Sequence, residues 1–475
     1  MPDDTDRMNE LLERQRRAFL KDGPPGLKKR LDLLDRLENA VRSRQDDFCK
    51  AISADFSVRS EHETVVAEIF LVIEAIRQAR AKVGKWMRPA RRCTSMAFFP
   101  GKSMVMYQPL GCVGIISPWN YPVQLALSPM VGALAAGNRV MLKPSELTPA
   151  TSDLLATVLG EAFAAEEVAV LTGGAEIGRA FSSLPFDHLF FTGSPNVGSL
   201  VMQAAAKNLV PVTLELGGKS PALVLPGFDM DRAALSIATG KLFNAGQTCI
   251  APDYAMVPAG SVASFVESMK SQVASMYPSL AGNPDYTAII NDAHRERINR
   301  LVDDAAAKGA RVVRLNPAEE NLAGSGKIAP TIVLDVDDDM PLMREEIFGP
   351  VLPVMEYDTL DEAISYVQRH PRPLALYCFG NDNAPIDRIL NLTVSGGVTV
   401  NDTLLHVAQE SLPFGGVGNS GMGTYHGEDG FRTFSHAKSV FFQRRLNGMS
   451  LIRPPYGHRF NRLMRFLIDR KVGKD

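Results

Sequence analysis

The chain has 475 residues, 45% of them hydrophobic, and a formal net charge of −2. This length exceeds what one hydrophobic core usually supports, so we expect two large lobes with smaller appendages. A net charge so close to zero excludes a general attraction to nucleic acid or to anionic membranes. No run approaches the ~18 consecutive apolar residues of a membrane helix, so we expect no membrane span.

The cysteines and histidines predict neither a disulfide framework nor a metal site. The five cysteines are odd in number, widely spaced and without a CxxC pair, and the eight histidines include no HxxxH pair. The amino terminus begins with acidic residues and lacks the apolar core of a signal peptide. We therefore expect a reducing compartment and place the protein in the cytoplasm.

Helices are predicted for residues 4–90, where Leu27, Leu31, Leu34 and Val41 recur on one helical face. From Gly111 the pattern changes to short apolar runs that alternate with helical stretches. Because strands and helices alternate, we predict a parallel, doubly wound sheet. The runs predicted as strands lie at residues 111–116, 139–143, 168–171, 188–192 and 212–216.

A second series of alternating strands and helices begins after Ser220. It opens with a predicted strand at 221–225 and a predicted helix at 229–244, and it continues to about residue 400. We therefore predict an α/β protein with two doubly wound, Rossmann-like lobes.

Two segments follow the second lobe. A glycine-rich loop at 411–423 is expected to return toward the site of reaction. The segment from residue 446 is basic, and apolar residues interleave with its arginines. We predict an amphipathic helix there that packs on its own subunit.

Cys249 is the candidate nucleophile. It lies in the turn Asn244-Ala-Gly-Gln-Thr-Cys249, and a thiolate attacks carbonyls and has a lowered pKa where backbone N–H groups converge. The other four cysteines are expected to be inert, buried side chains. Glu215, at the end of a predicted strand, could activate water. Taken alone, a glutamate at a strand end is more often a solvated residue or a cap.

The cofactor signal is unusual, because no GxGxxG fingerprint follows the first predicted strand. Residues 416–421 match that pattern, but they open no βαβ unit, so we interpret the match as a false positive. In Thr192-Gly-Ser-Pro-Asn-Val-Gly198 a strand runs into a helix, whose free N–H groups can bind a pyrophosphate. Gly193, Ser194 and Gly198 would line this site.

Six segments together closely resemble the aldehyde dehydrogenase superfamily, in the family's order and over nearly the whole chain. Within the superfamily the chain resembles the shorter, class 3-like branch, and residues 244–254 and 401–410 are similar to those of bacterial coniferyl-aldehyde dehydrogenases. The six segments are Ser117-Pro-Trp-Asn-Tyr-Pro122, Lys143-Pro-Ser-Glu146, Phe191-Thr-Gly-Ser194, Leu214-Glu-Leu-Gly-Gly-Lys-Ser-Pro221, the run from Phe243 to Tyr254, and Glu345-Glu-Ile-Phe-Gly-Pro350.

The resemblance implies NAD(P)-dependent oxidation of an aldehyde to its acid through a cysteine thiohemiacetal and thioester. Cys249 would be the nucleophile, Asn120 an oxyanion donor and Glu215 the base for deacylation. An asparagine after a strand is otherwise more often a turn or cap residue. The family's cofactor-binding residues match Trp119, Lys143, Glu146, Glu346 and Phe348.

Glu146 can accept a hydrogen bond from a ribose 2′-hydroxyl and repel a 2′-phosphate, so NAD is expected first, with NADP also accepted. Coniferyl aldehyde, giving ferulate, is the expected substrate, with Tyr121, Phe243, His406 and Phe414 as pocket residues. The alternative substrate is a broad range of medium- or long-chain aliphatic or aromatic aldehydes. A coenzyme A-acylating enzyme, or a structural protein that has lost catalysis, would be further alternatives.

The resemblance also implies a division of the chain. An NAD(P)-binding domain would comprise residues 1–93 and 111–214, and a catalytic domain residues 215–410. A bridging arm of residues 94–110 and 433–445 would pair two subunits into a homodimer. Residues 411–432 would form the active-site return loop, and residues 446–475 the basic tail.

Overall fold

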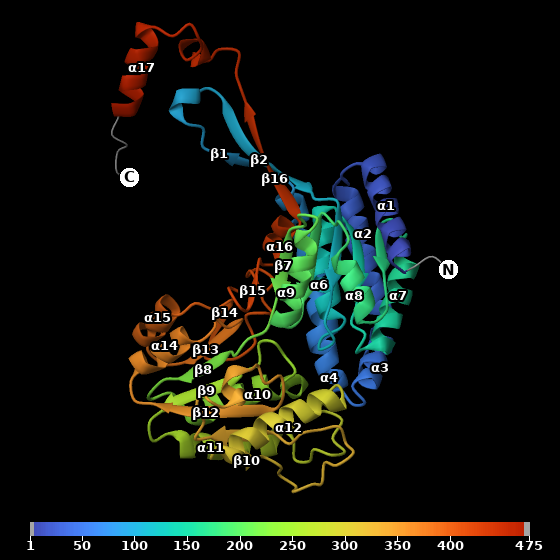
Figure 1. Ribbon diagram of the computed structural model, residues 1–475, viewed down its shortest axis with the longest axis vertical. Coiled ribbons are helices and arrows are strands. Elements are labelled where there is room, and N and C mark those ends of the chain that lie inside the picture. Colours follow the sequence, from blue (N-terminus) through green and yellow to red (C-terminus); the bar gives the residue numbers. More distant parts are fainter. Residues whose placement is uncertain (1–3, 470–475) are drawn as a thin grey trace.

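The first lobe is built on a six-stranded sheet in the order β15-β7-β6-β3-β4-β5. The structure is a computed structural model, and it describes residues 4–469 (Figure 1). Strands β3 to β7 run parallel, whereas β15 is antiparallel to β7. Five of the six strands lie where apolar runs predicted them. The bounds are β3 Cys112–Ile116, β4 Arg139–Lys143, β5 Val168–Val170, β6 His188–Thr192, β7 Val212–Glu215 and β15 Gly421–Met422.

Helices cover both faces of this sheet, because successive side chains of a strand point to opposite faces. Val113 and Ile115 of β3 pack in the core with α2, α5, α6 and α7, whereas Cys112 and Ile116 pack in the core with α1, α8 and α9. The predicted doubly wound lobe is therefore confirmed. Its helices are α1 Asp4–Asp22, α2 Leu27–Ser43, α3 Gln45–Asp55, α4 Glu61–Thr64, the π-helix η1 Val65–Phe70, α5 Leu71–Trp86, α6 Gln124–Ala136, α7 Pro149–Ala162, α8 Ala175–Ser182 and α9 Pro195–Ala206.

The second lobe has a seven-stranded sheet in the order β10-β11-β12-β9-β8-β13-β14, in which only β10 is antiparallel to its neighbour among the described strands. Helices α10 and α11 cover one face, and α12, α14 and α15 cover the other. The strands are β8 Pro221–Val224, β9 Tyr254–Pro258, β10 Arg311–Arg314, β11 Thr331–Leu334, β12 Val351–Tyr357, β13 Ala375–Phe379 and β14 Gly397–Val400. The helices are α10 Met230–Leu242, the 3₁₀ turn η3 Phe243–Gly246, α11 Val262–Met276, α12 Asp292–Ala307, α13 Pro341–Arg344, α14 Leu360–Arg369 and α15 Asn383–Leu392.

A three-stranded antiparallel sheet projects from the first lobe (Figure 1). Its strands are β1 (Ala90–Arg92), β2 (Lys102–Pro109) and β16 (Ser435–Phe442), and β16 follows α16 (Gly427–Thr433). The arm was expected to begin at residue 94, but its edge strand already starts at Ala90. Cys49, Cys112 and Cys378 are buried as expected, whereas Cys93, in this arm, is exposed.

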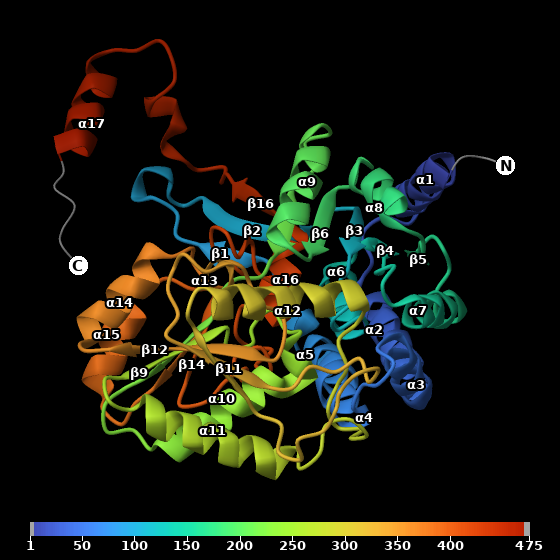
Figure 2. The ribbon, with the colours of Figure 1, turned by 60° about the horizontal axis from the view of Figure 1, so that its bottom comes forward.

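The tail extends beyond the arm (Figures 1 and 2). It comprises η4 (Gly448–Leu451) and α17 (His458–Asp469), and α17 has no buried residue. Its apolar residues are half-buried at most, and it contacts η4. The basic residues Arg470, Lys471 and Lys474 lie outside the described residues.

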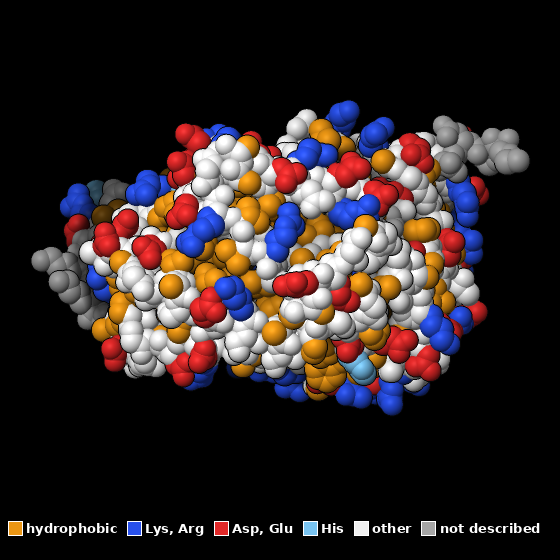
Figure 3. All heavy atoms as spheres, turned by 90° about the horizontal axis from the view of Figure 1, so that it is seen from below, with side chains coloured by type: hydrophobic (Ala, Val, Ile, Leu, Met, Phe, Trp, Pro, Cys, Tyr) orange, Lys and Arg blue, Asp and Glu red, His pale blue; other side chains and the backbone are white. Residues whose placement is uncertain are grey.

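No helix among residues 4–469 combines the length and the apolar character that crossing a bilayer requires. On the face shown in Figure 3, basic and acidic side chains are interspersed. This mixture agrees with the small net charge of the sequence.

Candidate active site

The predicted nucleophile follows a strained turn of the second lobe. Cys249 lies three residues after the end of η3, in which Asn244 and Ala245 have left-handed φ angles of 52° and 51°. Such angles are unfavourable for a residue with a Cβ atom, so neighbouring groups must hold the turn. The buried Gln247 contributes, because its Nε2 donates to the carbonyl oxygen of Asn244 at 3.0 Å.

The surroundings of the Cys249 sulfur favour the neutral thiol. Burial raises the pKa of Cys249 above its ordinary value, and the charges of Glu346 and Glu215 raise this pKa further. The backbone N–H groups of Cys249 and Ile250 lower it, but less strongly. A base must therefore take the proton of this thiol before the sulfur can attack a carbonyl.

Asn120 lies between β3 and α6, beyond the carboxyl end of the first sheet, and is buried. Its Nδ2 donates to the backbone carbonyl of Gln247 at 3.1 Å. Because a carboxamide carries two N–H groups, one of them remains for another acceptor. This hydrogen bond joins the loop that carries Asn120 to the loop that carries Cys249.

Two buried carboxyl groups act on the pKa of the thiol. Glu215 ends β7, and neither of its carboxylate oxygens has a hydrogen-bond partner among the described residues, so burial raises its pKa well above the ordinary value. Burial, and then the charge of Asp253, raises the pKa of Glu346 to about 8. The Glu346 carboxylate fills the space where a side chain at Gly217 would stand.

Trp119 and Phe348, two of the residues that the resemblance assigned to the cofactor, lie in contact. Their ring centroids are 5.4 Å apart, and the ring of His294 lies 5.0 Å from Trp119. The sequence analysis missed His294, which no local motif distinguishes from the other histidines. Burial, and then the charge of Arg297, lowers the pKa of His294, so its ring is neutral at neutral pH.

Lys143 and Glu146 form an ion pair at the carboxyl end of β4. The Lys143 Nζ and a Glu146 carboxylate oxygen are 2.7 Å apart, and Lys143 is buried whereas Glu146 is partly exposed. Burial raises the pKa of Glu146, but the hydrogen bonds from Lys143 and from its own backbone N–H, together with the charge of Lys143, leave the pKa below its ordinary value. Glu146 is therefore ionised at neutral pH and can accept hydrogen bonds.

The predicted phosphate segment forms the start of α9, although its three residues differ in role. The Ser194 Oγ accepts from the Val197 N–H at 3.4 Å and caps the helix. The Gly193 N–H donates to the backbone carbonyl of Glu215 at 3.0 Å. A Cβ atom on Gly198 would lie 2.6 Å from the Leu216 side chain, so this glycine allows close packing there, and its place in the phosphate site stays a prediction.

Further polar groups at the carboxyl ends of the strands of the first sheet fit a dinucleotide. The hydroxyl groups of Ser117, after β3, and Thr192, at the end of β6, are buried and have no partner within residues 4–469. Together with the Lys143–Glu146 pair and the start of α9, they provide donors and acceptors where open α/β sheets bind ligands.

The four predicted pocket residues form two separate groups. Tyr121 and Phe243 pack in one small apolar cluster, and the Tyr121 hydroxyl is 2.7 Å from the Thr248 hydroxyl. His406 and Phe414 stack with ring centroids 6.0 Å apart. Their role in substrate binding stays a prediction.

Tyr425 and His426 extend the second group, and the sequence analysis missed both. The His426 ring stacks on Phe414 at 5.3 Å, and the Tyr425 ring lies 4.5 Å from His426. Both ring nitrogens of His426 are buried without a hydrogen-bond partner in the described chain. Burial raises the pKa of Tyr425, and the charges of Glu215 and Cys249 raise it further.

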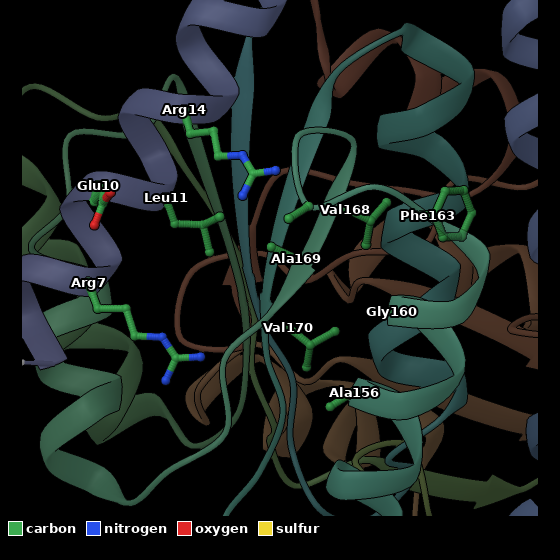
Figure 4. A pocket seen from close by; sticks show the side chains of 11 residues that line it. Arg7, Glu10, Leu11, Arg14, Ala156, Gly160, Phe163, Val168, Ala169 and Val170 are labelled. Atoms are coloured by element: carbon green, nitrogen blue, oxygen red, sulfur yellow. The ribbon is translucent and has the colours of Figure 1, made fainter.

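A cavity of about 450 Å³ lies elsewhere, between α1 and α7 and over the edge strand β5 (Figure 4). Side chains of Arg7, Leu11 and Arg14 come from α1, and Val168 and Val170 come from β5. None of the candidate catalytic residues lines it, so this cavity is separate from the candidate active site.

Two doubly wound lobes that place a half-buried thiol near two carboxyl groups and a candidate dinucleotide site are typical of α/β oxidoreductases. The family model described as "Aldehyde dehydrogenase family" matches residues 4–440 of the chain. The chain therefore belongs to the aldehyde dehydrogenase family, whose members are NAD(P)-dependent oxidoreductases.

Individual relatives match nearly the whole chain. It is 52% identical to a probable coniferyl aldehyde dehydrogenase of Caulobacter vibrioides over 457 residues, covering 95% of this chain and 94% of the relative. It is 48% identical to a coniferyl aldehyde dehydrogenase of a Pseudomonas species, with 98% and 97% of the two chains covered. A solved structure of Staphylococcus aureus AldH in a substrate-bound state is similar, with a TM-score of 0.91, 37% identity and coverage of 97% and 99%.

Proposed function

We propose that this aldehyde dehydrogenase oxidises coniferyl aldehyde, or a closely similar aromatic aldehyde, to the acid. The names of the relatives from Caulobacter and Pseudomonas support this substrate. The observation that carries the chemistry is the hydrogen bond from Asn120 to Gln247, two residues before Cys249. It places a side-chain N–H donor beside the loop of the nucleophile.

Cys249 is the nucleophile in this proposal. The thiol gives up its proton to solvent water, and the sulfur forms a bond to the aldehyde carbon. The carbonyl oxygen becomes an oxyanion, which accepts hydrogen bonds from the Asn120 side chain and from the Cys249 N–H. Bound NAD(P) supplies the acceptor for the hydride that leaves this carbon, and a thioester on Cys249 remains.

Hydrolysis of the thioester needs a second proton transfer. Glu215 removes a proton from water, and the hydroxide oxygen bonds to the thioester carbon. The carbon–sulfur bond then breaks, so the acid leaves and Cys249 becomes a thiolate again. Because burial raises the pKa of Glu215, its carboxylate is a stronger base than that of an exposed glutamate.

The first lobe binds the dinucleotide and the second carries the nucleophile in this proposal. Lys143 and Glu146 hold the adenosine ribose, the start of α9 at Ser194 holds the pyrophosphate, and Glu346 with Phe348 and Trp119 holds the nicotinamide end. The Glu346 Oε1 has no hydrogen-bond partner within residues 4–469, so it is available for a ribose hydroxyl. The ionised Glu146 favours NAD over NADP, because a 2′-phosphate would carry a like charge.

We also propose that the arm pairs two subunits. Its exposed apolar side chains are those expected at an interface between subunits. They include Phe98, Phe99, Phe441 and Phe442, which are 44% to 74% exposed.

The substrate is tested by NADH formation with coniferyl aldehyde and decanal in parallel, compared as kcat/KM. A clear preference for coniferyl aldehyde supports the proposal, whereas a preference for decanal assigns the enzyme to aliphatic aldehydes. Adding coenzyme A to the same assay separates hydrolysis from acyl transfer, because acyl-coenzyme A would form in place of the acid.

A further inference from the structure

Arg59 and Glu63, two charged residues of the N-terminal helical segment, contact the two loops that carry Asn120 and Cys249. Both side chains are buried, and neither belongs to a motif of the sequence analysis. They flank the start of α4, which continues directly into the π-helix η1. A π-helical turn inside an α-helix is rare and is frequent at functional sites.

Arg59 holds the loop that carries Asn120. Its Nη1 donates to the backbone carbonyl of Asn120 at 2.8 Å and lies 3.0 Å from a carboxylate oxygen of Glu68. The other Glu68 oxygen accepts the N–H groups of Val123 and Gln124 at 2.8 and 3.0 Å. The Arg59–Glu68 pair therefore fixes the backbone at both ends of the loop from Asn120 to Gln124.

Glu63 holds the strained turn before Cys249. Its Oε2 accepts the backbone N–H of Asn244 at 3.0 Å and the Thr287 hydroxyl at 3.2 Å. Asn244 is one of the two left-handed residues of η3. Its Nδ2 in turn donates to the Asn120 carbonyl at 3.0 Å, the same oxygen that accepts from Arg59.

The two loops come from different lobes, so their relative placement needs contacts that cross between them. A buried ion pair is usually a weak source of stability compared with apolar packing, so stability alone is a poor reason for Arg59 and Glu68. Hydrogen bonds that converge on one carbonyl set position and direction instead.

We propose that Arg59 and Glu63 are positioning residues that hold the oxyanion donor Asn120 in register with the Cys249 thiol. This inference rests on the roles proposed above for Asn120 and Cys249. Neither Arg59 nor Glu63 takes part in proton transfer. Their effect acts on the placement of the nucleophile and the donor, to which rates are sensitive even for displacements of about 1 Å.

The test compares Glu63→Ala and Glu63→Gln with Glu61→Gln in the full-length enzyme. Glu61 lies in the same helix, but its side chain is exposed, so Glu61→Gln is a matched control. We expect Glu63→Ala to lower kcat about 10- to 100-fold, with the KM for NAD unchanged within about twofold. Glu63→Gln keeps an oxygen that accepts the Asn244 N–H and should retain most of the kcat, and Glu61→Gln should equal wild type.

A second readout needs no turnover. The rate at which iodoacetamide alkylates Cys249, measured on the peptide that contains it, should change in Glu63→Ala and stay at the wild-type value in Glu61→Gln. Wild-type kcat and alkylation rates in Glu63→Ala would overturn the proposal. So would a loss of kcat that only parallels the loss of folded protein in a thermal melt.

Arg59 is tested with its partner removed, because Arg59→Met alone leaves a buried, unpaired Glu68 that could prevent folding. The double variant Arg59→Met/Glu68→Met should fold and still lose about 10-fold or more in kcat. A folded double variant with wild-type kcat would contradict a positioning role. If Cys249→Ala itself kept turnover, the proposed function would fail instead, which distinguishes the two failures.

Discussion

The turn that carries Cys249 and the arm formed by β1, β2 and β16 are held in opposite ways. Around the turn, buried polar groups from both lobes satisfy one another, as in the hydrogen bonds that join Asn120, Asn244 and Gln247. The arm instead exposes large apolar side chains such as Phe99 and Phe441. The comparison teaches that contacts within one chain fix the turn, whereas the arm leaves apolar side chains exposed, as expected if it pairs two subunits in the way proposed above.

The largest expected effect comes from removing the Cys249 sulfur. Cys249→Ala should lower NADH formation by about 10⁴-fold or more, because no other group can form the thioester. Binding of NADH, followed by its fluorescence, should stay near the wild-type affinity. Turnover comparable to wild type would contradict the assignment of the nucleophile.

The next effect separates the two halves of the reaction. Glu215→Gln should still give a burst of NADH in stopped flow and then stall, because the thioester forms but water is not activated. We expect a decrease of about 10²- to 10⁴-fold in the steady-state rate. If the burst also disappears, Glu215 acts before hydrolysis, as the base that takes the thiol proton.

The buried histidine His426 should make the free energy of unfolding depend on pH, whereas exposed histidines should not. Burial, and then the charge of His406, lowers the pKa of His426 from its ordinary value of 6.5 to about 3. Between these values the unfolded chain binds more protons than the folded chain, so the free energy of unfolding falls as the pH falls below about 6.5.

His426→Phe should remove part of this loss, on the order of 2 kcal/mol at about pH 5, or a few degrees in Tm. Melting temperatures of both proteins at about pH 7.5 and about pH 5 measure the difference. His62→Phe, at an exposed position, is the control. An equal fall in Tm for wild type and His426→Phe would show that His426 does not contribute.

The smallest effect on a single chain is expected in the arm. Phe441→Glu/Phe442→Glu adds charges to side chains that are already exposed, so the melting temperature of the monomer should change by no more than about 1 °C. The association of subunits should weaken instead, which sedimentation over a range of concentrations would show. A variant that stays dimeric at low micromolar concentration would exclude this face as the interface.

Local patterns of apolar residues predicted most strands and helices, but they predicted the ends of these elements less well. Strands such as β4 and β6 were found because continuous apolar runs alternate with helical periods, and helix α10 ends at Leu242 because the turn of Cys249 begins there. Leu27 was predicted to share a buried face, but it lies at the first turn of α2 and is 42% exposed. Ends of elements are where periodicity carries the least information.

The candidate site was predicted only where short motifs carry it. Cys249, Glu215 and Asn120 lie in such motifs, and the structure brings their loops together. Arg59 and Glu63 were missed, because their partners lie far along the chain and no spacing rule links an arginine to a backbone carbonyl. The π-helix η1 begins two residues after Glu63, and none of the sequence patterns considered above predicts a π-helix.

The small strand β15 has a consequence for the synthesis of the protein. Gly421 and Met422 pair with Leu214 and Glu215 at the edge of the first sheet. While the chain emerges from the ribosome, the edge of β7 stays open until almost all residues have been made. The first lobe can therefore be completed only near the end of translation, and a fragment that stops at residue 410 would leave this edge unpaired.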